Sequence, residues 1–370
     1  MCRDSGPTDH RQDPGEMRMV VGRLEARTQQ VLRAVIRDYI LRAQPVGSGR
    51  ITKRYRLDMS PATVRNIMAF LEDLDLLEQP HPSSGRVPTD RGFRYYVDAL
   101  MDPKPLHRDE KEFILNRVQD APHDVGMIMQ ETSRVLSHIS HYTSLVSSPR
   151  ISQTVFERID LIRLDRARIL MVLVSPTGVV YNRIIGDVRG LSQRDLDYAA
   201  EYLNRHIKGL PLAEAKQKIV EQMEAEKDQY DRILARVWNS SRRVLEAEQA
   251  DVYIDGQSNI LDYPEFSEDL RKMKSLLRAF EAKEIMLQLL DMALEGMGIQ
   301  VYIGEENQVE EMTDCSLIAT TYHQRGVPLG TLGLIGPKRM DYARMIPLVD
   351  FTAKAVGAKL EEMEGQLAGS

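Results

Sequence analysis

The sequence predicts an α+β protein of several domains that begins with a winged helix-turn-helix module. Two observations support this fold class. Residues 57–89 read as a helix with a polar outer face followed by a turn-rich, charged hairpin. Further along, runs of β-branched residues at 156–185 and 299–335 are separated by a long stretch with helical periodicity. With 370 residues, the chain has room for two or three domains.

Composition indicates a globular chain with packed cores, since 42% of its residues are hydrophobic. No apolar run approaches the ~20 residues needed to span a bilayer, and the first residues lack the apolar core of a signal peptide. The two cysteines, Cys2 and Cys315, cannot form a disulfide framework. We therefore expect a cytoplasmic protein that does not contact a membrane.

Charge is distributed unevenly along the chain. The net charge is −6 overall, but residues 23–98 contain 13 Lys or Arg and 9 Asp or Glu, a net +4. Residues 1–22 carry −1, which leaves −9 on residues 99–370. A basic module on an acidic body is suited to binding a polyanion such as DNA, although patchy charge is also common on surfaces that bind nothing.

The amino-terminal module is predicted as three helices. Residues 1–22 lack apolar periodicity and are expected to be a disordered tail. An apolar stripe predicts a helix from Leu24 to about Ala43, and Ser48 is expected to cap a short helix reaching about Tyr55. This short helix would be the first arm of a helix-turn-helix, with Ser60 opening the second.

Ser60 is a favourable N-cap, and Pro61 suits the first helical position, where no amide hydrogen is needed. The apolar stripe expected to face the core consists of Val64, Ile67, Met68, Leu71 and Leu74. Thr63, Arg65 and Asn66 then point elsewhere and offer the groups that read base edges and hold phosphates. The alternative is an ordinary amphipathic helix with a solvated face.

Residues 78–89 predict a hairpin of the kind that forms a wing beside a recognition helix. Its expected tip is Ser83-Ser84-Gly85-Arg86, and the prolines at positions 80, 82 and 88 restrict it to an exposed ribbon. A guanidinium at that tip could enter the minor groove of DNA. The alternative is that Arg86 pairs with an acidic neighbour such as Glu78.

The remaining elements are assigned from periodicity. Residues 92–101 predict a short helix whose aromatic side chains pack the rear of the module, with base stacking as the alternative, and residues 102–105 read as a linker. The other expected helices are 106–146, 192–250, 265–295 and 341–364, and the expected strands are 156–164, 169–174, 179–185, 252–257, 299–303, 315–322 and 331–335. The simplest arrangement is one α+β domain, begun by strands 156–185 and completed by strands 299–335, with a helical insertion.

Several motifs, in order, resemble the heat-inducible transcription repressor family, HrcA. They are Pro45-Val46-Gly47-Ser48, Ser60-Pro61-Ala62-Thr63-Val64-Arg65-Asn66, residues 79–89, residues 92–98, residues 303–307 and residues 335–342. The resemblance spans roughly residues 24–360. Gly49, Ile67, Asp75 and Pro82 depart from the usual residues of the family, which has Arg, an acidic residue, Gly and Thr there.

The resemblance implies a winged helix-turn-helix, a GAF-like α/β domain and an inserted, mainly helical dimerisation domain. It also implies a homodimer that binds the inverted-repeat CIRCE operator and represses chaperone operons. Heat is expected to release this repressor from the operator, and the GroEL chaperonin is expected to help keep it active. The expected domains are 1–22 (tail), 23–102 (winged helix), 103–188 and 266–370 (GAF-like), and 189–265 (insertion). The expected DNA contacts are Ser48, Lys53, Ser60, Thr63, Arg65, Asn66, His81, Ser83, Ser84 and Arg86, and the expected dimer contacts are Ile233, Val237 and Trp238.

Enzyme and metal chemistry are not predicted, and neither is a cofactor. His138 and His141 have a spacing that can bind a metal but lack further ligands nearby, and the glycines of 326–336 are better explained by turns and a bulged hairpin than by a phosphate loop. Two alternatives stay open: a metabolite-responsive regulator whose GAF-like domain binds an effector, and an enzyme with an appended DNA-binding module.

Overall fold

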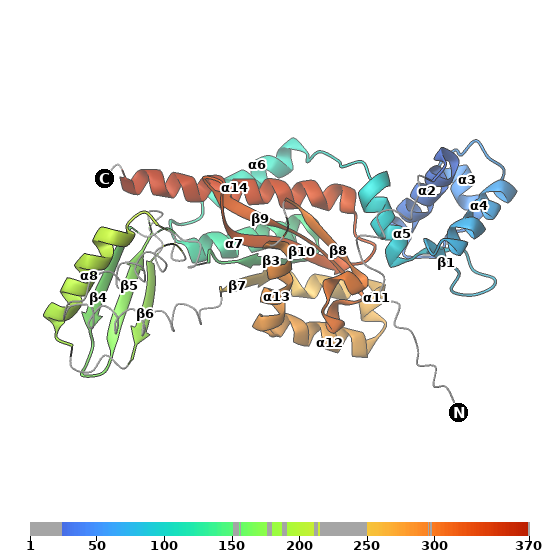
Figure 1. The fold of residues 1–370 in the computed structure, drawn as a ribbon. Helices are drawn as coiled ribbons and strands as arrows, with labels where there is room; N and C mark the ends of the chain where they lie inside the picture. The colour runs from blue at the N-terminus through green and yellow to red at the C-terminus, as the bar shows by residue number, and fades with distance from the viewer. Residues whose placement is uncertain are drawn as a thin grey trace, which may run out of the picture. The chain divides into compact units, whose positions relative to one another are not determined.

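The computed structural model describes residues 24–150, 155, 157–175, 180–186, 191–210, 214, 250–294, 296 and 298–368. The chain divides into two compact units, Met1–Met101 and Asp102–Ser370, and Figure 1 labels their elements. The predicted tail at 1–22 lies outside the described residues, as do the predicted dimer contacts Ile233, Val237 and Trp238. No described helix is long and apolar enough to cross a membrane.

The first unit is a three-helix bundle with a short hairpin and a closing helix. Its elements are α2 (Ala26–Arg42), α3 (Ser48–Arg54), α4 (Pro61–Asp73), β1 (Leu77–Glu78), β2 (Val87–Pro88), α5 (Asp90–Tyr95) and the π-helical turn η1 (Tyr96–Leu100). β1 and β2 pair in antiparallel fashion. Phe93 and Tyr96 are each 2% exposed, which confirms that these two rings pack the rear of the module and are not available for stacking on bases; Tyr95 is half-buried.

One local expectation in this unit is wrong. Ser48 does not cap α3, because Gly47 is the N-cap residue and no side chain there accepts a capping hydrogen bond. The backbone of the preceding Val46 is hydrogen-bonded to that of Arg86, and the chain is extended only as far as Gly47, so the helix starts at Ser48, one residue earlier than expected. Ser48 is the first helical residue and is buried.

The second unit is built on a five-stranded antiparallel sheet in the order β7-β3-β10-β9-β8. The strands are β3 (Thr143–Ser147), β7 (Val252–Asp255), β8 (Gln300–Ile303), β9 (Cys315–Gln324) and β10 (Val327–Pro337). On one face lie α7 (Val125–Ser140) and α14 (Tyr342–Ala368), with α6 (Arg108–Gln119) outside them. The other face is covered by α13 (Lys283–Leu294), beside α12 (Leu270–Glu281) and α11 (Pro264–Ser267).

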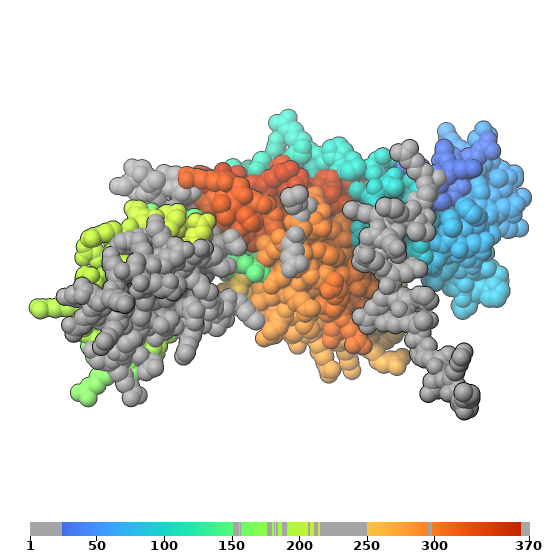
Figure 2. All heavy atoms as spheres, in the orientation of Figure 1, coloured from blue at the N-terminus to red at the C-terminus, as the bar shows by residue number. Residues whose placement is uncertain are grey.

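Both faces of this sheet are therefore buried. Leu317 and Ile335 point into a core with Phe280 and Leu290 of the α12–α13 layer, whereas the alternate residues of the same strands belong to the α14 side. In the space-filling view, the orange and red atoms of the carboxyl-terminal part of the chain lie against one another (Figure 2). Short 3-10 turns η3 (Gln257–Asp262), η4 (Gly304–Asn307) and η5 (Glu310–Met312) complete this unit.

The expected sheet arrangement is wrong in one respect. β4 (Arg158–Arg163), β5 (Ile169–Val174) and β6 (Val180–Ile185) form the predicted meander, but it is a separate three-stranded sheet that does not join strands 299–335. β3 takes the expected place instead, pairing with β10 on one side and β7 on the other. All five residues of β3 are buried, so the segment shows no alternation, and its sequence reads as the end of the helix expected at 106–146.

The meander has its own small core with α8 (Gln193–Ile207). Buried residues alternate along β4 and β5. Leu196, Ala199 and Leu203 are buried on α8, which packs against β4. Asn204 joins the helix to the sheet, since its side chain donates to the Ile159 carbonyl (2.9 Å) and accepts from the Ile159 amide (2.7 Å). The predicted helical region 192–250 is described as helix up to Ile207, and nearly all that follows lies outside the described residues.

The predicted single helix at 265–295 is three helices. Asp269 starts α12 by accepting hydrogen bonds from the amides of Arg271 and Lys272, and Ala282 adopts an extended conformation between α12 and α13. The glycine-rich segment is the β9–β10 hairpin, in which Gly326 has a positive φ of 81° and the register shifts between Pro328 and Gly330. The bulged-hairpin interpretation of these glycines is confirmed.

Candidate DNA-binding interface

Helix α4 begins as the sequence predicts. Ser60 is the N-cap, its Oγ accepts a hydrogen bond from the Thr63 amide (3.1 Å), and Pro61 occupies the first turn. The Ser60 and Thr63 hydroxyls also lie 2.9 Å apart and share a hydrogen bond. Both hydroxyls are thereby held at the start of the helix, where backbone N–H groups and the helix dipole favour a phosphate.

The outer face of α4 is solvent-exposed along its length. Val64, Met68 and Leu71 are buried against the module, whereas Thr63, Arg65 and Asn66 are exposed. Within the part of the chain that the structure describes, the Arg65 and Asn66 side chains form no ion pair or hydrogen bond. They are free to take partners from a DNA groove, where guanidinium and amide groups can each form paired hydrogen bonds to a base.

Helix α3 contributes a second set of basic residues. Lys53 is exposed, whereas Arg50 and Arg54 both bind the carboxylate of Asp38, at 3.0 and 3.5 Å. Asp38 lies on α2 with only 1% of its side chain exposed, so it fixes α3 against α2 by charge as well as by packing. Burial, together with the nearby Asp38 carboxylate, raises the pKa of the Tyr55 hydroxyl.

The sequence reasoning missed this cluster. Asp38, Arg50 and Arg54 are spread over two predicted helices, and their only sequence signal is an acidic residue beside the apolar stripe of the first helix. The predicted contact Ser48 is buried at the start of α3 and does not belong to the exposed surface of α4.

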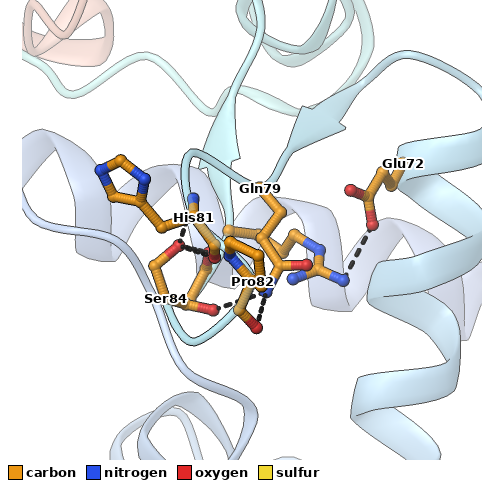
Figure 3. Close-up of polar contacts among 7 residues, drawn as sticks. Glu72, Gln79, His81, Pro82 and Ser84 are labelled. Carbon is orange, nitrogen blue, oxygen red and sulfur yellow. Dashed lines mark hydrogen bonds and ion pairs between the residues drawn. The ribbon is translucent and has the colours of Figure 1, made fainter.

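The wing loop, residues 79–85, is organised by its own hydrogen bonds (Figure 3). The Gln79 Nε2 donates to the carbonyls of Pro82 (2.9 Å) and Ser84 (3.0 Å). The Ser84 Oγ donates to the His81 carbonyl (2.8 Å) and accepts from the His81 amide (3.1 Å). The loop therefore holds its shape before any partner binds, with His81 and Ser83 exposed and Ser84 directed into the loop.

Arg86 lies at the base of the wing and not at its tip. Its backbone pairs with that of Val46: the Val46 amide donates to the Arg86 carbonyl (2.8 Å), and the Arg86 amide donates to the Val46 carbonyl (3.0 Å). Its guanidinium binds the carboxylate of Glu72 on α4 at 2.8 Å, with 18% of the side chain exposed. The expected tip assignment is therefore wrong, and the acidic partner is Glu72 instead of Glu78. A direct contact of Arg86 with DNA stays a prediction.

Asp75 shapes the turn between α4 and the wing. It has a positive φ of 58°, a conformation that glycine adopts easily and aspartate tolerates. Its carbonyl accepts the Thr89 hydroxyl (2.6 Å) and its carboxylate binds Arg91 (3.2 Å). The departure from the usual glycine of the family is therefore accommodated.

Among the described residues, no group of three or more His, Cys, Asp or Glu is placed to hold a metal ion. His138 lies beside the ring of Phe113. Cys315 is 1% exposed, and burial raises the pKa of its thiol, which disfavours the reactive thiolate form.

These features define a winged helix-turn-helix DNA-binding protein: a capped helix with an exposed basic and amide face, a supporting helix and a preformed wing. Two family models match the chain. "Winged helix-turn-helix transcription repressor, HrcA DNA-binding" matches residues 23–97, and "HrcA protein C terminal domain" matches residues 126–346.

Relatives agree with these models. The Heat-inducible transcription repressor HrcA of Geobacter sulfurreducens is 44% identical over 91% of this chain and 98% of its own length. That of Syntrophobacter fumaroxidans is 42% identical over 92% of this chain and 98% of its own length. The chain belongs to the HrcA family of heat-inducible transcription repressors.

A solved structure shares the fold. A crystal structure titled as that of a hypothetical protein matches with a TM-score of 0.56 and 20% identity, covering 92% of this chain and all of the other.

Proposed function

We propose that this repressor binds the inverted-repeat CIRCE operator upstream of chaperone operons, as a homodimer in the cytoplasm, and that heat releases it. The observation that carries the proposal is the exposed face of α4, where Arg65 and Asn66 are unpaired among the described residues, beside a preformed wing. The proposed DNA contacts are Lys53, Ser60, Thr63, Arg65, Asn66, His81 and Ser83, with Ser48, Ser84 and Arg86 supporting them from less exposed positions.

Footprinting on genomic DNA tests this proposal, because it identifies the partner and its sequence together. Protection of an inverted repeat, with two equally protected half-sites separated by whole helical turns, would support it. Protection of single sites without symmetry would contradict the dimeric operator, and protection that required a small metabolite would favour a metabolite-responsive regulator.

Dimerisation is proposed because one winged helix buries too little surface for tight, specific repression, whereas two modules at matched spacing suit a palindrome. The proposed contacts, Ile233, Val237 and Trp238, come from the apolar stripe of the insertion. Replacing Ile233 and Trp238 together with polar residues is expected to shift sedimentation from dimer to monomer and to weaken operator binding at least tenfold. An unchanged dimer with the same double substitution would contradict this assignment.

Heat release is proposed to follow from loss of the active dimer, with the GroEL chaperonin restoring it. Support comes from the heat-inducible naming of the relatives. Repressor heated and then cooled should regain operator binding faster with GroEL and ATP than without them. Equal recovery in both samples would contradict a role for the chaperonin.

A further inference from the structure

A side-chain link joins the wing to the recognition helix. Arg86 lies at the base of the wing and Glu72 in the last turn of α4, and their charged groups lie 2.8 Å apart. Figure 3 labels Glu72 and marks its ion pair with a dashed line. Among the described residues, no other hydrogen bond or ion pair joins residues 79–88 to α4. This ion pair is therefore the polar contact, among the described residues, that holds the wing directly against the recognition helix.

The backbone of Arg86 is held in place by its contacts with Val46. Val46 is fully buried and exchanges two hydrogen bonds with Arg86. Gly85 lies so close to Val46 that an added Cβ would be 2.4 Å from its carbonyl carbon and oxygen. The Arg86 side chain therefore leaves the wing from one defined position, and its Nε is buried without a hydrogen-bond partner in the described part of the chain. Its charge is directed to Glu72.

The rest of the wing behaves as one body. Gln79 and Ser84 bind the loop to itself, so movement of the wing is movement of the whole loop about its base. An ion pair at that base resists such a movement, although a partly exposed pair contributes little to overall stability. Its influence is expected on geometry more than on the free energy of unfolding.

We propose that Glu72 and Arg86 form a positioning clamp that sets the wing relative to α4 and so contributes to the selectivity of DNA binding. Selectivity requires the bases read by α4 and the backbone held by the wing to be engaged at the same time. A second consequence concerns charge: Glu72 keeps the Arg86 guanidinium occupied, which prevents it from binding phosphates at unrelated sequences. Neither residue needs to touch a base for this effect.

The test compares Glu72→Gln, Arg86→Gln and the double variant on the footprinted site and on scrambled DNA. Glu72→Gln frees the Arg86 guanidinium to bind one more phosphate, so affinity for scrambled DNA should rise about threefold. The salt slope, the change of log affinity with log salt concentration, should steepen by about 0.9. Arg86→Gln should not steepen the slope. Each variant should lower the ratio of specific to scrambled affinity about fivefold, and the double variant should lower it no further than Arg86→Gln alone.

Arg86→Lys separates positioning from charge. Lysine keeps the positive charge but lacks the planar fork, so it should recover part of the lost ratio. The matched control is Asp75→Asn, which removes the ion pair between Asp75, in the turn before β1, and Arg91 of α5 (3.2 Å). Asparagine tolerates a positive φ, and this pair does not join the wing to α4. Asp75→Asn should leave the ratio of specific to scrambled affinity within twofold of the wild-type value.

A measurement without DNA completes the test. Hydrogen exchange at the Val46 and Arg86 amides should accelerate in Glu72→Gln and stay slow in Asp75→Asn, while calorimetry shows folded protein. The proposal is overturned if the effects of Glu72→Gln and Arg86→Gln on the affinity ratio add up in the double variant. It is also overturned if Arg86→Gln flattens the salt slope by about one while Glu72→Gln changes neither the slope nor the ratio. The latter result would show that Arg86 binds phosphate directly. The specific DNA in this test is whichever sequence the wild-type protein protects in the footprint. The outcome therefore does not depend on whether that sequence is the CIRCE operator.

Discussion

Replacing Arg65 with alanine is expected to lower affinity for the operator by about 10- to 100-fold and to leave affinity for scrambled DNA nearly unchanged. A guanidinium that forms two hydrogen bonds to a base contributes about 1–3 kcal/mol of discrimination. Arg65 is exposed in the second turn of a capped helix, and no described residue competes for it. Fluorescence anisotropy with both duplexes at fixed salt measures the effect.

Lys53→Ala is the matched comparison, since Lys53 is an exposed residue of α3. It should weaken binding to both duplexes by a similar factor and flatten the salt slope by about 0.9, because it removes one phosphate contact. Equal losses on both duplexes for Arg65→Ala as well would mean that α4 holds the backbone without reading sequence.

The winged helix could be predicted because its signals are local. The Ser60 cap, Pro61 and the stripe through Leu71 all lie within one helix, and each acts through neighbours three or four residues away. The prolines of the wing likewise limit the backbone around themselves. The structure confirms this helix and the hairpin that follows it.

The internal geometry of the site could not be predicted in the same way. Arg86 was expected at the tip because Ser-Ser-Gly-Arg reads as a turn, but the backbone of Val46, forty residues earlier in the chain, pairs with it. That pairing turns the side chain toward Glu72. A contact between such distant segments has no periodicity or spacing to reveal it.

The sheet of the second unit shows the same limit on a larger scale. β3 is a short strand buried along its whole length, and such a strand cannot be distinguished by periodicity from the end of the helix before it. Without β3, the strands at 158–185 are the nearest in sequence that could pair with those at 300–337, whereas in the structure β3 pairs with β10 and β7. The strands themselves were predicted correctly, but their partners depended on a segment that carries no alternating pattern.

Gly85→Ala is expected to damage the DNA-binding unit more than any surface substitution in it. The new Cβ would lie 2.4 Å from the carbonyl carbon and oxygen of Val46, atoms of the backbone that no side-chain rotation can move away. Relieving the clash requires the Val46–Arg86 hydrogen bonds to open or the wing to shift. Overpacking of this kind costs about 1–3 kcal/mol, and a domain of this size melts roughly 4–8 °C lower for each kcal/mol lost.

Operator affinity should fall more than tenfold in Gly85→Ala, even at temperatures where calorimetry of the full chain shows the protein folded, because the displaced wing no longer lies beside α4. Gly49→Ala is the control within the same unit. Gly49 lies inside α3, where an added Cβ would meet no atom within 4 Å apart from its chain neighbours and the backbone of its own helix. Replacing glycine in a helix by alanine stabilises it by roughly 0.5–1 kcal/mol. It should therefore melt slightly higher and bind the operator within about twofold of wild type. If Gly85→Ala also matched wild type in melting and affinity, the wing would tolerate displacement from Val46, and its fixed position could not be a condition for DNA binding.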